Sequence, residues 1–89
     1  MIEELDLVVL TQDFDKHGLK SGDVGTVVGC WGDGKAFEVE FITSDGETIA
    51  VLTLERDEVR PREGDEILHV RPLEAGRLRS KQSISEVVR

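Results

Sequence analysis

Three side chains in this sequence could act as a nucleophile, a general base or a zinc ligand: Cys30, His17 and His69. Zinc sites need several ligands at close spacing, such as Cys-x-x-Cys or His-x-x-x-His pairs, and the sequence has no such pair. A cysteine nucleophile would also need a positioned base and an oxyanion site, for which no motif is recognisable. We therefore expect no enzyme activity, no metal and no cofactor, and we expect Cys30 to be a small half-buried strand residue.

The segment from Asp13 to Gly18 has the beginning of a calcium-binding loop. Asp13 and Asp15 occupy positions one and three, and Gly18 occupies position six. Position twelve, where a bidentate glutamate is required, is Val24, and no helix is predicted on either side. We interpret the segment as a polar loop whose carboxylates accept hydrogen bonds from nearby backbone.

Trp31 is the single tryptophan, and it stands beside a predicted turn that contains Asp33. In small β-barrels such a turn and a long first loop, here with Asp13 and Asp15, flank the usual binding groove. An exposed aromatic side chain among carboxylates would suit a basic or proline-containing segment of a partner. The alternative is that Trp31 closes the core, and the sequence leaves both interpretations open.

Carboxylates dominate the first two thirds of the chain. Residues 1–61 carry 5 Lys/Arg and 14 Asp/Glu, a net charge of −9, whereas residues 62–89 carry 6 and 5, a net charge of +1. Glu38 and Glu40 are expected to form an acidic surface together with Glu47, Glu55, Asp57 and Glu58. Because such a surface repels phosphate backbones, we expect a protein partner with a basic patch and not a nucleic acid.

The sequence also indicates the cellular compartment of the protein. It has no apolar run of transmembrane length, and its N-terminus is acidic where a signal peptide would be basic. A single cysteine excludes an internal disulfide. We expect a cytoplasmic protein that does not bind a membrane.

Short apolar runs separated by glycine-rich turns predict one all-β domain over residues 1–61. The expected strands are Asp6–Thr11, Gly22–Trp31, Ala36–Ile42, Glu47–Leu54 and Val59–Pro61, with a 3₁₀ turn at Glu55–Glu58. Phe37, Val39 and Phe41 alternate with glutamates, and Gly25 within a strand pattern indicates a bend or a close backbone approach. The pattern favours a small five-stranded SH3-like barrel. An open antiparallel meander is the alternative, and an OB-type barrel fits less well because its strands are longer.

Residues 62–89 form a C-terminal tail with a different composition. Glu66–Arg71 is expected to add an edge strand that covers the doubly apolar run Leu7–Leu10, and Leu73–Gln82 has weak helical spacing. After Pro72, the tail offers apolar side chains for contact with a partner or with a second copy of the chain. These include Leu78, Ile84 and Val87. A disordered end is the alternative.

From Asp6 to Pro61, the chain resembles the domain-of-unknown-function family 4926 of small bacterial proteins. The matching segments are Asp6–Leu10, Gly22–Val28, Ala36–Phe41, Asp45–Thr48 and Val59–Pro61. The resemblance implies an SH3-like barrel, brings no established activity, and suggests a small bacterial protein encoded beside its partner. The Gly-x-x-Gly-Thr-Val-Val pattern is also similar to ribosome-associated KOW segments and to barrel subunits of larger enzymes, but many barrels need it for geometry alone.

Three functions remain open from the sequence. We favour a non-enzymatic protein-binding module, the small acidic partner of a neighbouring protein in an antitoxin- or immunity-like role. A nucleic-acid or ribosome-associated barrel would have to use the tail cations Arg71, Arg77, Arg79 and Lys81. The third is an accessory barrel subunit of a larger enzyme, which would supply packing and no catalytic residue.

Overall fold

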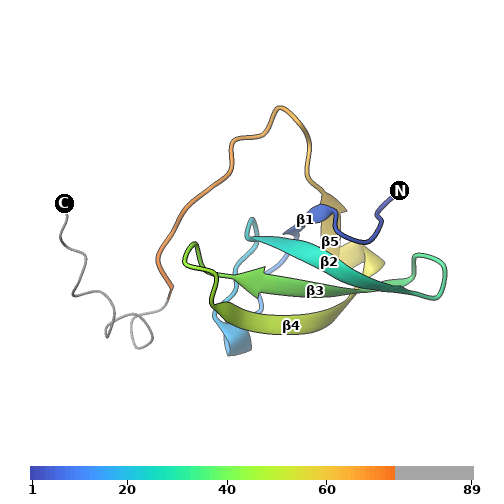
Figure 1. Ribbon diagram of the computed structural model, residues 1–89, viewed down its shortest axis with the longest axis horizontal. Helices are drawn as coiled ribbons and strands as arrows, with labels where there is room; N and C mark the ends of the chain where they lie inside the picture. The colour runs from blue at the N-terminus through green and yellow to red at the C-terminus, as the bar shows by residue number, and fades with distance from the viewer. Residues whose placement is uncertain (74–89) are drawn as a thin grey trace.

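A computed structural model, which describes residues 1–73, contains five strands and two short 3₁₀ turns (Figure 1). The strands are β1 (Leu7–Leu10), β2 (Val24–Trp31), β3 (Ala36–Ile42), β4 (Thr48–Glu55) and β5 (Val59–Pro61), and the turns are η1 (Asp15–His17) and η2 (Arg56–Glu58). All five predicted strands are confirmed within two residues at each end. β2 begins at Val24 because the preceding Gly22 and Asp23 form a turn, in which the Asp23 amide donates to the Lys20 carbonyl at 2.9 Å.

The strands form one antiparallel sheet in the order β4-β3-β2-β1-β5. A simple open meander would leave β5 beside β4, but β5 instead pairs with β1, with Val59 opposite Leu10. The η2 turn carries the chain from β4 across to β5. This return of the last strand to the first curls the sheet into the small SH3-like barrel that the sequence predicts.

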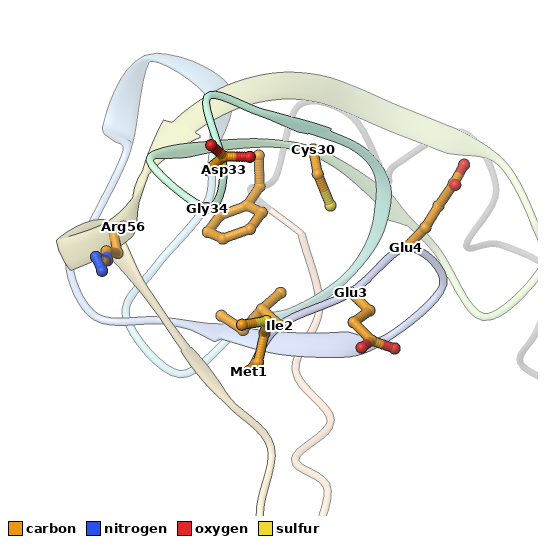
Figure 2. A pocket seen from close by; sticks show the side chains of 9 residues that line it. Met1, Ile2, Glu3, Glu4, Cys30, Asp33, Gly34 and Arg56 are labelled. Carbon is orange, nitrogen blue, oxygen red and sulfur yellow. The ribbon is translucent and has the colours of Figure 1, made fainter.

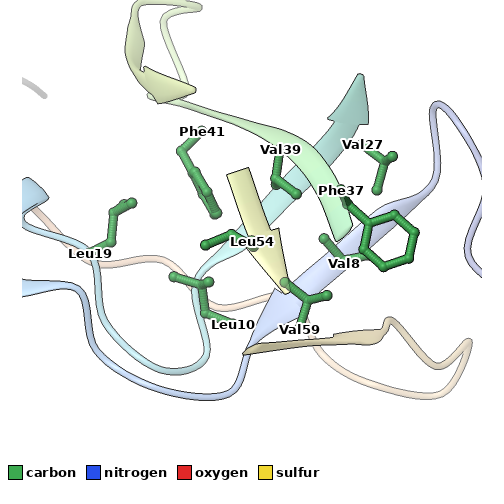
Figure 3. Close-up of a cluster of buried hydrophobic side chains, with 9 residues drawn as sticks. All are labelled: Val8, Leu10, Leu19, Val27, Phe37, Val39, Phe41, Leu54 and Val59. Carbon is green, nitrogen blue, oxygen red and sulfur yellow. The ribbon is translucent and has the colours of Figure 1, made fainter. Parts of the chain in front are cut away.

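Nine apolar side chains from all five strands and the first loop form the core, and they point toward one another in Figure 3. They are Val8, Leu10, Leu19, Val27, Phe37, Val39, Phe41, Leu54 and Val59. The alternation predicted for β3 is confirmed, because Phe37, Val39 and Phe41 are buried while Glu38 and Glu40 between them are only half-buried. Val9, on the face of β1 opposite Val8 and Leu10, is also buried, so β1 is covered on both faces as expected.

Gly25 lies where β2 passes closest to the aromatic core. A Cβ atom at this position would lie 2.6 Å from Val39 Cγ1 and 2.7 Å from Phe41 Cε1, both far inside van der Waals contact. The close approach predicted for this glycine is therefore confirmed, and any side chain here would displace the residues of β3 that organise the core.

The segment after β5 differs from the prediction. Residues 62–73 contain no strand, so the expected edge strand at Glu66–Arg71 is wrong. Ile67 and Val70 are 94% and 95% exposed, so they cover no part of β1. Side-chain ion pairs at both ends hold this segment in place of a backbone ladder: Arg60 to Glu66 at 2.6 Å, and Arg71 to Asp23 at 2.6 Å.

Candidate protein-binding surface

The register of β2, β3 and β4 gathers three of the predicted partner-binding residues on one side of the sheet. Residues directly opposite each other in antiparallel strands point to the same face. On β3 and β4, Glu38 lies opposite Thr53 and Glu40 lies opposite Val51. Trp31 of β2 lies opposite Ala36, which is two residues before Glu38 along β3 and therefore on the same face. We call the surface formed by Trp31, Glu38, Glu40, Val51 and Thr53, which faces away from the core, the outer face.

Apolar and acidic groups alternate across the outer face. Trp31 is 55% exposed and Val51 is 51% exposed. The Glu40 carboxylate accepts a hydrogen bond from the Thr48 hydroxyl at 2.8 Å, which fixes it on the surface. Trp31 is not part of the core cluster, so of the two interpretations left open by the sequence, closure of the core is wrong. An exposed tryptophan on the same face as carboxylates can stack on a cation while the carboxylates attract it.

A bulge explains why Trp31 faces outward. Strict alternation from the buried Val27 would direct residue 31 into the barrel. The β2–β3 register shifts between Val27 and Gly29, which inserts one residue and reverses the alternation beyond it. Trp31 therefore lies on the outer face, and Cys30 lies opposite the buried Phe37.

The remaining predicted acidic residues lie elsewhere. Asp13 and Asp15 belong to the loop before β2, whereas Trp31 ends β2, so the strand separates them (Figure 1). Asp13 Oδ1 accepts a hydrogen bond from the Ser21 amide at 2.8 Å, and Asp15 Oδ1 accepts one from Lys20 Nζ at 2.9 Å. For Asp13, the interpretation as a local backbone acceptor is confirmed. Leu78, Ile84 and Val87 lie outside the described residues.

A shallow pocket of about 480 Å³ opens at the end of the barrel beside the β2–β3 turn (Figure 2). Ile2, Cys30 and Phe37 provide apolar lining, while Asp33 and Arg56 lie at its rim. Cys30 is exposed here, so its expected half-burial is wrong. Cys30 lies on the inner face of β2, opposite Phe37, but it stays exposed because it is at the end of the barrel. Asp33, with φ of 54°, bends the turn that borders this pocket.

The candidate metal and nucleophile residues of the sequence lie in different parts of the barrel. Within residues 1–73, no group of three or more His, Cys, Asp or Glu side chains is arranged to hold a metal ion. His69 is engaged at Asp23, at the start of β2, while Cys30 lies near the other end of that strand. His17 belongs to η1, in the loop before β2, so both histidines lie on the side of β2 away from Cys30.

One charged cluster was not foreseen from the sequence. The Asp23 side chain is 11% exposed and accepts hydrogen bonds from Arg71 Nε at 2.9 Å, Arg71 Nη2 at 2.6 Å and the Lys20 amide at 2.8 Å. His69 Nε2 lies 3.3 Å from the same carboxylate, and Arg71 Nη2 also donates to the Gly18 carbonyl at 2.8 Å. We call Asp23, His69 and Arg71 the clasp, because together they pin the segment after β5 to the first loop.

We expect the clasp to stabilise the protein only while Asp23 is ionised. Burial disfavours the charged carboxylate, but hydrogen bonds from Arg71, the Lys20 amide and His69 outweigh burial and lower the pKa of Asp23 below its ordinary value of 3.8. Because the pKa is lower in the folded than in the unfolded chain, this stabilisation is present above about pH 3.8 and is lost as the pH falls through the folded-state pKa.

The measurement compares Asp23→Asn with the unaltered chain by urea unfolding between about pH 2 and pH 7. At neutral pH the substitution should lower the free energy of unfolding by about 1–3 kcal/mol, because it weakens charge-assisted hydrogen bonds. The difference between the two proteins should narrow as the pH falls below 3.8. A difference that stays constant across this range would contradict the role of the ionised carboxylate.

Comparison with known proteins identifies a family and no characterised relative. A family model described as a domain of unknown function, DUF4926, matches residues 4–61. No curated protein and no solved structure matches the chain significantly. The matched segment contains the whole barrel and Asp23, whereas His69 and Arg71 of the clasp lie beyond it. Among the described residues, no helix is long and apolar enough to cross a membrane.

Proposed function

The chain belongs to the DUF4926 family, whose function is unknown, and from the geometry of its outer face we propose that it is a non-enzymatic protein-binding module. In this proposal it is the small acidic partner of another protein, encoded nearby, in an antitoxin- or immunity-like role. The outer face binds a basic patch of that protein. The observation that carries the proposal is the exposed Trp31 on the same face as Glu38 and Glu40.

Three physical features support this function. Tryptophan is enriched among the residues that dominate binding energy in protein interfaces. The net charge of −9 on residues 1–61 would steer a basic partner toward the barrel and repel acidic competitors. Glu38 and Glu40 are half-buried residues of β3, and the Thr48 hydroxyl holds the Glu40 carboxylate, so the position of this carboxylate is restricted before a partner arrives.

Nucleic-acid binding is less well supported by the clasp. Of the four tail cations that could contact phosphate, Arg71 donates two hydrogen bonds to Asp23 and a third to the Gly18 carbonyl. Releasing it for a phosphate would take the paired arginine away from the Asp23 carboxylate in a site that is mostly shielded from water. The other three cations lie outside the described residues.

The proposal is tested with the protein encoded by the adjacent gene. A double variant, Glu38→Gln with Glu40→Gln, removes two charges from the outer face and should weaken binding of that protein by about tenfold. The matched control, Asp13→Asn with Asp15→Asn, removes the same charge from the loop at the other end of β2 and should change the affinity much less. Titration calorimetry at low and moderate salt measures both.

The contrast between the two double variants decides the outcome. Equal weakening by both would indicate that net charge alone attracts the partner, and it would contradict a specific role for the outer face. Binding that is insensitive to salt and to the Glu38 and Glu40 substitutions would contradict the proposal as a whole.

A further inference from the structure

β4 forms one edge of the sheet described over residues 1–73. It is eight residues long, whereas β5 at the other edge has three. From Thr48 to Leu54 the strand contains no charged residue, no proline and no glycine. Natural edge strands are usually shortened, charged or interrupted, because a long uncharged edge is a template for pairing with another chain.

The direction of the backbone amides along β4 follows from the ladder with β3. The Arg56 amide donates to the Lys35 carbonyl at 3.2 Å, which continues the pairing of Glu55 with Ala36 and of Leu54 with Phe37. Amides of an antiparallel strand alternate between its two sides. Those of Leu54 and Leu52 therefore point toward β3, and those of Thr53 and Val51 point toward the open edge.

The next amide along the strand agrees with this alternation. The Glu55 amide should also point away from β3, and it donates instead to Glu58 Oε1 at 2.8 Å, within the capping box of η2. At the strand end the outward amide is thus satisfied by a side chain. The outward amides of Val51 and Thr53, in the middle of the strand, lie where an added strand would accept from them.

The side chains beside this edge define the chemistry of that strand. On the outer face, Val51 is exposed, and Glu40 lies opposite it on the neighbouring strand β3. On the inner side, Leu52 is partly buried and packs against the core. A strand paired with β4 would place alternate side chains on these two sides. Lysine or arginine would extend over Val51 to Glu40, while aliphatic side chains would cover Leu52.

We propose that the basic partner binds as an extended strand added to β4, with Lys or Arg alternating with aliphatic residues. This inference rests on the proposed function and specifies how the outer face is used. A second copy of this chain is the competing occupant. The net charge of −8 on each chain opposes it, since pairing two β4 edges would bring the carboxylates of two outer faces together.

The test uses the full chain and a short synthetic peptide that alternates valine and lysine, with a valine–glutamate peptide as control. Amide hydrogen exchange followed by NMR gives a residue-specific result. In the free chain, the Val51 and Thr53 amides should exchange rapidly while those of Leu52 and Leu54 are protected. The valine–lysine peptide should slow exchange at Val51 and Thr53, and the valine–glutamate peptide should not.

Two variants at one position separate backbone pairing from side-chain contact. Thr53→Pro removes the outward amide and should weaken peptide binding by about tenfold, because proline cannot donate to an added strand. Thr53→Ala keeps the amide and removes only the side chain, so it measures the side-chain contact alone, and Thr53→Pro should weaken binding well beyond it. If Thr53→Pro does not fold, as judged by its melting curve, the exchange pattern of the unaltered chain decides.

Three outcomes would overturn strand addition. They are protection of both outward amides in the free chain, absence of peptide binding, and binding that leaves both amides unprotected. In the last case, a loss of peptide affinity in the variant Glu38→Gln with Glu40→Gln would leave the proposed function standing and reject strand addition alone. Failure of the adjacent-gene protein to bind would reject the proposed function, whatever the peptide does.

Discussion

Replacing Gly25 with alanine is expected to lower the free energy of unfolding by about 1–3 kcal/mol, the cost of adding a methyl group to a tightly packed core. The new Cβ would lie 2.6 Å from Val39 and 2.7 Å from Phe41, and both residues are almost fully buried. Neither side chain has free space to move into without displacing others in the core. For a domain of this size, the loss corresponds to a decrease in melting temperature of roughly 4–24 °C.

Gly29→Ala in the same strand is the matched control. A Cβ there would lie 3.5 Å from the Glu38 Cβ, which is ordinary contact on the outer face. Alanine should therefore be tolerated with a change of less than about 1 kcal/mol. Thermal and urea unfolding of both variants measure the difference. Equal destabilisation by the two substitutions would contradict the view that Gly25 is required by close approach to the β3 core residues.

Replacing Trp31 with alanine is expected to weaken partner binding by about 30-fold or more, which corresponds to about 2 kcal/mol at a central interface residue. Because the indole is 55% exposed and lies outside the core cluster, the same substitution should change the melting temperature little. A large loss of affinity without a loss of stability is the combination that distinguishes an interface tryptophan from a core one.

Ile67→Ala is the control for that result. Ile67 is 94% exposed, but it belongs to the segment after β5 and not to the outer face. Its removal should leave the affinity for the adjacent-gene protein unchanged within about twofold. If Trp31→Ala and Ile67→Ala reduce binding equally, general surface hydrophobicity would explain association better than the outer face does.

Much of the barrel could be predicted because its signals are local. The alternation of Phe37, Val39 and Phe41 and the glycine-containing turns lie within a few residues of the structures they specify. Gly25 also carried a readable signal, since a glycine within a β-branched run is costly unless a close approach requires it. Five short strands and a long first loop favoured an SH3-like barrel over an open meander, and the pairing of β5 with β1 agrees with that choice.

The candidate site was less predictable for two physical reasons. The outward direction of Trp31 depends on a bulge between Val27 and Gly29, which has no clear sequence signature and reverses the alternation after it. The clasp joins Asp23 to Arg71, which are 48 residues apart. No sequence pattern near either residue indicates that the other is its partner. The same ion pair holds the segment after β5 outside the sheet, where apolar content predicted a strand.

The most direct test of the outer face as a binding surface is an NMR titration of the labelled full chain with the protein encoded by the adjacent gene. We predict that the largest shift changes will occur at the Trp31 indole and at Glu38, Glu40 and Val51, and that they will diminish as salt is added. Changes centred instead on the end pocket around Cys30 and Phe37, or the absence of any complex, would contradict the account.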